Sequence, residues 1–197
     1  EVQANVKRAE AFLETEDFVA AYKAAQLAWS KFRLLFVESC PSKDGELRGV
    51  WIHSPYGIAD WGWDKTIKVL ADNGFNAIFP NFLWGYNADY PSEVLPNHPT
   101  VDGKDGKIDF LQQCLNACKK YKVEMHVWKV NWNMGHRSSE DMKKRMQLLG
   151  RTQVTFNGND TDYLSPHNPD NLALEVAAML EIVRKYPVDG IHFDYIR

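Results

Sequence analysis

The spacing of apolar residues changes at about residue 40 of the 197-residue chain. Before that point, apolar residues recur every three or four positions, which is the spacing of an amphipathic helix. They are Ala21, Ala25, Ala28, Phe32 and Leu35. Asp17 stands where it can cap the longer of two helices, so residues 1–40 are expected to form a helical hairpin or linker. Residues 41–46 are polar, contain Pro and Gly, and predict a domain boundary.

Beyond residue 46 the pattern becomes one of alternating strands and helices. Short apolar runs predict strands at 49–54, 76–81, 123–132 and 188–196, with a short extended piece around 163–165. Helical spacing predicts helices at 64–73, 108–122, 139–149 and 171–185. This order indicates a parallel sheet with right-handed crossovers. The long loop at 82–107 is rich in Gly, Pro, Asn and aromatic residues, and loops of this length usually have a function.

Two observations favour a TIM-type (β/α)8 barrel over a doubly wound sheet. The first strand runs into His53, Ser54 and Pro55 rather than into a Gly-rich phosphate loop. Polar residues also follow the carboxyl ends of the strands, where barrel active sites form. Four strands leave two open edges, so we expect residues 46–197 to be the N-terminal half of such a barrel. Both chain ends look like cuts, and we expect the native protein to continue beyond Arg197.

The composition of the chain reduces the number of functions that need to be considered. The net charge of −3 implies no large basic surface, so nucleic acid is not an expected partner. No run of about 18 apolar residues is present to span a membrane. Three cysteines without a Cys/His cluster predict neither a disulfide framework nor a structural zinc site, and we expect no cofactor. Seven Trp residues suit a carbohydrate cleft, because the apolar faces of sugars stack on aromatic rings.

The last strand carries the strongest catalytic candidate, Asp194. Side chains alternate between the faces of a strand, so His192 and Asp194 share one face, while Ile191, Phe193 and Tyr195 share the other. A carboxylate pointing into a barrel is costly unless it is hydrogen-bonded or used. Asp194 and His192 can also simply pair with each other, which remains the structural alternative.

Other strand ends and the long loop offer substrate-binding groups. Amides and imidazoles suit sugar hydroxyls because they donate and accept hydrogen bonds, and aromatic side chains can stack on a sugar ring. The candidate substrate-binding residues are His53, Asn81, Trp84, Tyr90, Asn131, Trp132 and His192.

Several segments resemble the glycosyl-hydrolase-like family ten, formerly a domain of unknown function. They cover about residues 46–197 in the order expected for the family. The matching segments are Leu47 to His53, Gly74 to Pro80, Asp89 to Ser92, Val123 to Trp128, Ser165 to Pro169, and Val188 to Arg197. The last of these is the most specific, because the family typically has Asp-Gly-Ile-His-Phe-Asp-Tyr at this position.

The resemblance implies a barrel hydrolase that acts on polysaccharide or cell-wall glycan. It assigns the catalytic role to Asp194 and adds Arg197 to His53 and His192 in the site. It also implies a secreted, periplasmic or lipid-anchored protein, as many members are. Glycoside hydrolysis normally needs two carboxylates, so we expect the acid to lie beyond the chain end and this piece alone to be inactive.

Two alternatives to a glycosidase remain open. The first is a barrel that binds carbohydrate without cleaving it, which needs the aromatic residues but not Asp194. The second is a metal-dependent amidohydrolase or deacetylase that uses His53, His192 and Asp194.

Overall fold

The computed structural model describes residues 1–41, 43–135 and 138–196. The chain divides into two compact units, Glu1–Glu46 and Leu47–Arg197. In the described part of the chain, no helix is both long and apolar enough to cross a membrane.

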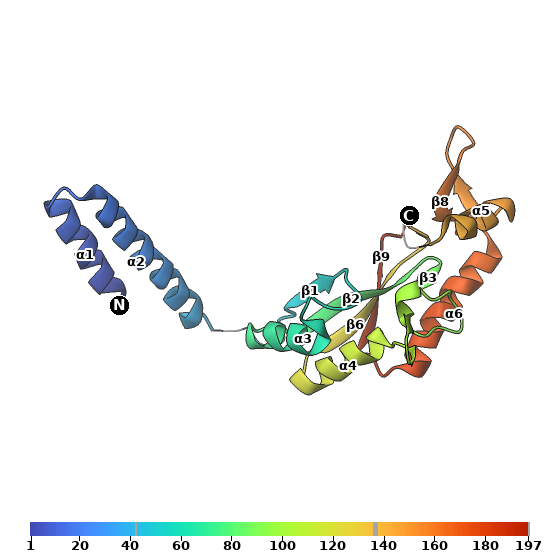
Figure 1. Cartoon of the computed structure of the whole chain (residues 1–197), viewed down its shortest axis with the longest axis horizontal. Helices are drawn as coiled ribbons and strands as arrows, with labels where there is room; N and C mark the ends of the chain where they lie inside the picture. The colour runs from blue at the N-terminus through green and yellow to red at the C-terminus, as the bar shows by residue number, and fades with distance from the viewer. Residues whose placement is uncertain (42, 136–137, 197) are drawn as a thin grey trace. The chain divides into compact units, whose positions relative to one another are not determined.

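The first unit is a hairpin of α1 (Val2–Glu14) and α2 (Phe18–Ser39), drawn in blue in Figure 1. The prediction that Asp17 caps the longer helix is confirmed, since its Oδ1 accepts a hydrogen bond from the backbone N of Ala20 at 3.0 Å. An ion pair between Lys31 and Glu1 joins the two helices at the end away from the turn. Small residues fill the seam between the helices: Asn5, Ala9, Ala21, Ala24 and Ala28.

In the described residues, the second unit is built on four parallel strands in the order β1-β2-β6-β9. They are β1 (Gly49–Ile52), β2 (Ala77–Trp84), β6 (Glu124–Val130) and β9 (Gly190–Asp194). Strands alternate with helices, and two helices precede the sheet, so the predicted α/β class and partial barrel are confirmed. The described strands do not close, and β1 and β9 are the two ends of the parallel row.

One side of the sheet is covered by helices (Figure 1). They are α3 (Gly62–Asp72), α4 (Phe110–Tyr121) and α6 (Pro169–Lys185). Apolar side chains of the strands pack against this layer and form the main core, which includes Ile67, Ile78, Leu111, Leu115, Met125, Val127 and Ile182. This burial is the main contribution to the stability of the unit.

The long loop contains more regular structure than its polar composition predicted. It includes β3 (Asn87–Ala88), which pairs antiparallel with β2, a 3-10 turn η1 (Pro99–Val101), and the hairpin of β4 (Asp102–Gly103) and β5 (Gly106–Lys107). Between β6 and α6 lie α5 (Glu140–Leu148) and a second hairpin, β7 (Thr152–Val154) with β8 (Asp160–Leu164). Strands this short have too few alternating positions for a reliable prediction.

The second strand is longer than predicted. We expected it to end at Asn81, but β2 continues to Trp84, because Leu83 pairs with both Ala88 of β3 and Lys129 of β6. Asn81 therefore lies inside the strand, beside a local shift in register. This moves Trp84 from the predicted loop to the strand end.

Candidate active site on the open face of the sheet

The two faces of the sheet differ in what covers them. On β9, Ile191 and Phe193 face α6 and line a groove with Val176 and Met179. His192 contacts the rings of Trp51 and Phe79 on the opposite side. We call that opposite side the open face. It carries Trp51, His53, Phe79, His126, Trp128, Val130 and His192, and the alternation of side chains along β9 adds Asp194.

Aromatic and imidazole rings form a continuous layer on the open face. Phe79 is at its centre: its ring stacks on Trp51 with centroids 5.0 Å apart, and it lies 5.0 Å from the ring of His192 and 5.2 Å from that of His126. Glycine on the neighbouring strands makes room for these rings. A Cβ at Gly190 would lie only 2.3 Å from Nδ1 of His126.

The two candidate histidines take different positions in this layer. Trp51 donates its Nε1–H to Nε2 of His192 at 3.1 Å. Nε2 of His192 is therefore the acceptor in this contact. His53 follows β1, and its ring meets that of Trp128 edge-on at 4.6 Å. Both imidazoles thus lie on the face that also holds Asp194.

Asp194 is the last residue of β9 and pairs in register with Val130. Its side chain is half-buried, and Oδ1 accepts a hydrogen bond from the backbone N of Tyr195 at 2.7 Å. Its own carbonyl accepts from the backbone N of Asn131 at 3.1 Å, which joins the ends of β9 and β6. The carboxylate is therefore held at the carboxyl end of the sheet, where barrel enzymes place catalytic groups.

The expected orientation of Tyr195 is wrong. We expected its side chain to share a face with Ile191 and Phe193, but its ring stacks on Trp128 at 6.2 Å. Its positive φ of 52° turns the chain directly after β9, so the alternation of side chains stops there. Tyr195 consequently adds another exposed ring beside Asp194.

Asn81 and Trp84 support the open face from within β2. Asn81 is buried, and its Nδ2 donates to the carbonyls of Trp128 at 3.1 Å and Leu83 at 3.2 Å across the shift in register. Trp84 packs against Phe79, Trp128 and Val130. Asn81 thus holds strands together, and Trp84 completes the aromatic layer.

Asn131 and Trp132 are turned toward α6 instead. Nδ2 of Asn131 donates to Oε2 of Glu175 at 2.7 Å, and the backbone N of Trp132 donates to Oε1 at 3.4 Å. Trp132 has a φ of 64°, and its side chain packs on the cluster formed by Met134, Met146 and Leu164. Their side chains therefore do not gather with Asp194 on the open face.

Tyr90 is fully buried in the helix-side core. Its hydroxyl donates to Oε2 of Glu181 at 2.7 Å, and its ring meets Tyr186 edge-on at 5.9 Å. Burial, together with the Glu181 carboxylate, raises the pKa of the Tyr90 hydroxyl well above its ordinary value. In this position Tyr90 anchors the long loop to α6 and presents no face for a sugar to stack on.

Two further expectations concern Arg197 and a metal site. Arg197 lies outside the described residues. The described residues contain no group of three His, Cys, Asp or Glu side chains that could hold a metal ion.

Several open-face residues were missed by sequence reasoning, chiefly Trp51, Phe79, His126 and Trp128. The signal for them was present, because Trp51 and His53, and likewise His126 and Trp128, stand two positions apart and must share a face of their strand.

Comparisons with known proteins find a matching family and named relatives. The family model described as "Glycosyl hydrolase-like 10" matches residues 46–196. "Glycosyl hydrolase YngK" of Bacillus subtilis (strain 168) is 30% identical over 186 residues, covering 81% of this chain and 36% of that protein. "Glycosyl hydrolase DigH" of Escherichia coli (strain K12) is 27% identical over 135 residues, covering 61% of this chain and 30% of that protein.

The chain therefore spans about a third of the length of these curated relatives. The family match, in contrast, takes in all four parallel strands and the three helices that cover them. On the strength of that match, the chain belongs to the glycosyl hydrolase-like 10 family.

Proposed function

We propose that this protein hydrolyses O-glycosidic bonds in a polysaccharide or cell-wall glycan, with Asp194 as nucleophile or general base. The observation that carries the proposal is the position of Asp194 at the carboxyl end of a sheet face covered with aromatic rings. The family and the names of its relatives support the same reaction class.

The chemistry of glycoside hydrolysis explains why these groups belong together. The transition state has oxocarbenium character, and a carboxylate beside the anomeric carbon stabilises the developing positive charge or attacks it. Exposed rings such as Trp51 and Tyr195 supply flat apolar surfaces for pyranose faces. Imidazoles at His53 and His192 supply hydrogen-bonding partners for sugar hydroxyls.

A second carboxylate is needed to protonate the leaving oxygen. Glu124 also lies on the open face, but at the amino end of β6, where its carboxylate is 3.0 Å from Nε2 of His126. It is thus at the opposite end of the strands from Asp194. We do not assign the acid to a described residue.

The proposal is tested with the protein at its full natural length. It is incubated with peptide-free cell-wall glycan strands and a panel of polysaccharides, and products are identified by mass spectrometry. The test variant is Asp194→Asn, and the control is Asp105→Asn, which changes an exposed carboxylate in the β4–β5 turn.

We expect new oligosaccharides from the parent and from Asp105→Asn, and none from Asp194→Asn with its fold intact. Equal turnover by Asp194→Asn would remove Asp194 from the mechanism. Glycan binding by all three proteins without any products would instead support the alternative of a carbohydrate-binding barrel, which the aromatic face also suits.

We also propose that the protein acts outside the cytoplasm, in the periplasm, on the cell surface or in the medium. The reason is that a cell-wall substrate is found there.

A further inference from the structure

The helical hairpin lies outside the family match, which begins at residue 46, and has a surface that its own fold leaves uncovered. Its seam is filled mainly with alanine, whereas its large apolar side chains point outward. Phe18 is 66% exposed, Trp29 61% and Phe36 60%. Isolated surface residues of this kind are normal, but a contiguous set marks an interaction site.

The exposed aromatic residues of α2 form one stripe. At 100° per residue, they fall within about 80° of one another around the helix axis. They are Phe18, Tyr22, Trp29, Phe32 and Phe36. Neighbouring rings in the stripe touch, since Trp29 and Phe32 stack with centroids 5.9 Å apart.

The aromatic stripe borders an apolar groove between the two helices, with a volume of about 440 Å³. On α1 the apolar lining has spacings of four, three and four residues, with Val2, Val6, Ala9 and Leu13, and Glu10 also borders the groove. On α2 it is lined by Ala25, Ala28, Trp29 and Phe32. Apolar residues at these spacings are the ones that interdigitate when helices pack into a bundle.

The exposed apolar area of the hairpin approaches that of a standard dimer interface. A buried aromatic side chain contributes roughly 150–250 Å². The five half-exposed aromatic residues of α2 therefore offer on the order of 500 Å² between them. Exposed aliphatic residues such as Val6 and Leu13 bring the surface toward the roughly 800 Å² per partner of a standard interface.

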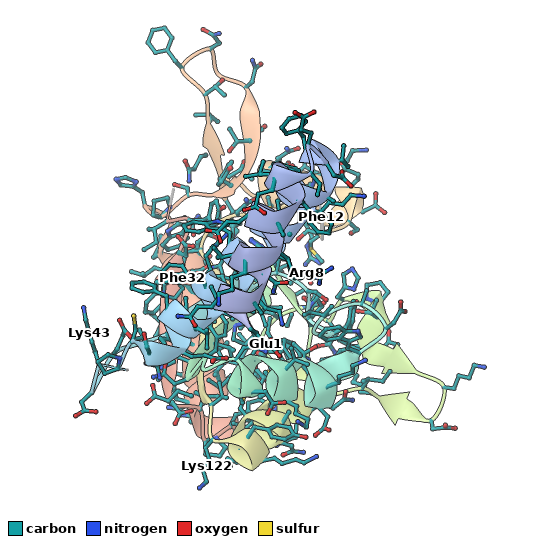
Figure 2. All side chains as sticks on the ribbon, turned by 90° about the vertical axis from the view of Figure 1, so that its left-hand side faces the viewer. Glu1, Arg8, Phe12, Phe32, Lys43 and Lys122 are labelled. Carbon is teal, nitrogen blue, oxygen red and sulfur yellow. The ribbon has the colours of Figure 1, made fainter. Side chains whose placement is uncertain are left out.

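The charges of the hairpin are arranged so that two copies complement each other head to tail. Around the turn, residues 10–23 contain four acidic residues and one basic residue. The rest of the hairpin, residues 1–9 and 24–39, contains four basic residues and two acidic ones. Figure 2 labels Phe12 near the acidic turn, Arg8 in the basic part, and Glu1 at the far end of α1.

We propose that the occupant of this surface is the hairpin of a second copy of the chain, packed antiparallel to form a four-helix bundle. In that orientation, the acidic turn of each copy lies against the basic part of the other, while the apolar grooves face each other. Because the two copies bury the same patch, the interface closes as a symmetric dimer. The near balance of charge on the hairpin, five basic residues against six acidic, gives no excess of basic groups to favour an anionic lipid surface instead.

The test measures the mass of the whole 197-residue chain by sedimentation velocity at micromolar concentrations. The variant Trp29→Glu/Phe32→Glu places charges in the apolar surface. The matched control, Val176→Glu/Val183→Glu, changes two residues of the exposed apolar side of α6, each 50% exposed. Far-ultraviolet circular dichroism checks that helix content is retained in both.

We expect a dimer for the parent and for the α6 variant, and a monomer for the hairpin variant. The parent dimer should also weaken at least tenfold when salt rises from 50 to about 500 mM, because screening removes the attraction between opposite charges. A monomeric parent would overturn the proposal. So would a dimer that the α6 variant loses and the hairpin variant keeps, since association would then belong to the sheet unit.

A charge exchange tests the orientation. Glu10→Lys/Glu14→Lys makes the turn basic, and Arg8→Glu/Arg33→Glu makes the rest acidic, so each variant alone should dimerise at least tenfold more weakly. Mixing the two should restore a heterodimer. If both variants dimerise as tightly as the parent, or if the parent dimer strengthens with salt, the antiparallel arrangement is wrong.

Discussion

Lys129 of β6 and Glu175 of α6 form an ion pair buried from solvent, with Nζ and Oε1 3.2 Å apart. Nζ of Lys129 also donates to the carbonyl of Trp84 at 2.8 Å, and the carboxylate of Glu175 accepts from Asn131. Burial lowers the pKa of Lys129, and the negative charge of Glu175 opposes this change. One pair of charges thus joins the ends of β2 and β6 to α6, directly behind the aromatic layer.

Removing one member of the ion pair should lower the free energy of unfolding far more than removing both members. Lys129→Met leaves Glu175 buried without a counter-charge, and we expect a loss of about 3–5 kcal/mol in the free energy of unfolding. The double variant Lys129→Met/Glu175→Leu should recover a large part of this loss. The measurement is urea denaturation followed by near-ultraviolet circular dichroism.

The control for this prediction is Lys120→Met. Lys120 also pairs with a carboxylate, Asp64, at 2.8 Å, but both side chains are exposed to solvent. Its replacement should leave the unfolding curve almost unchanged, because water screens an exposed pair. If Lys129→Met behaves like Lys120→Met, the buried pair does not hold the strand ends.

The open face should bind carbohydrate through its exposed rings. Two matched variants test this prediction. Trp51 and Phe193 are each 52% exposed, but they lie on opposite faces of the sheet. We expect Trp51→Ala to weaken glycan binding about tenfold, equivalent to about 1.4 kcal/mol, through loss of a stacking surface. Phe193→Ala should leave binding unchanged. Isothermal titration calorimetry with an oligosaccharide product decides between them, and equal effects would argue against the open face as the binding site.

Acid should destabilise the anchor of the long loop through Glu181. Burial raises the pKa of this carboxyl, but hydrogen bonds from Glu93 N, Ser92 Oγ, the Tyr90 hydroxyl and Lys185 lower it by more, so the net direction is downward. A carboxyl with a folded-state pKa below its unfolded value contributes stability above the unfolded pKa, near 4.5, and loses it as pH falls through the folded pKa.

Glu181→Gln should therefore cost about 1–3 kcal/mol at neutral pH, because its partners lose a charged acceptor. It should also flatten the decline in stability below about pH 4.5. Thermal unfolding between pH 3 and 7 measures both effects. An acid decline as steep in Glu181→Gln as in the exposed-site variant Asp105→Asn would show that other carboxyl groups are responsible.

Gly85 allows two loops to meet closely at the carboxyl end of the sheet. Its backbone N donates to the carbonyl of Asn133 at 2.8 Å, and an added Cβ would lie 2.7 Å from the carbonyl carbon of Trp132. Because backbone rather than a flexible side chain stands in the way, Gly85→Ala should destabilise the fold by about 1–3 kcal/mol.

The comparison for this variant is Gly158→Ala in the β7–β8 turn. A Cβ added at Gly158 would have no atom within 4 Å, so only the strain of a positive φ of 78° disfavours alanine at this position. Chemical denaturation of both variants separates steric overlap from backbone strain. A smaller loss for Gly85→Ala than for Gly158→Ala would mean that the two loops move apart easily.

Features that depend on neighbouring residues in the chain were accessible from the sequence. Asp17 was expected to cap the longer helix of the hairpin, and it accepts a hydrogen bond from the backbone N three residues later. The order of strands and helices followed from periodicity and led to the correct fold class. The alternation along β9 likewise placed His192 and Asp194 together, opposite Ile191 and Phe193.

Expectations failed where a residue's surroundings come from distant parts of the chain. Tyr90 was expected in an open loop, yet Glu181 and Tyr186 of α6 hold it in the core. Asn81 was expected at a strand end, but pairing with β3 and β6 extended β2 past it. No local pattern encodes these partners, because they lie from a few to about 90 residues away in the sequence.

The sequence by itself thus determined the class of fold and the family, because periodicity, capping and motif spacing are local properties. It also singled out Asp194, whose catalytic role stays a prediction. The tertiary structure decided which aromatic residues share a face with Asp194, and it turned Asn131 and Trp132 toward Glu175. The physical reason is that strand register and helix packing bring together residues from distant segments. No single segment specifies how such residues bury one another, pair their charges or share hydrogen bonds.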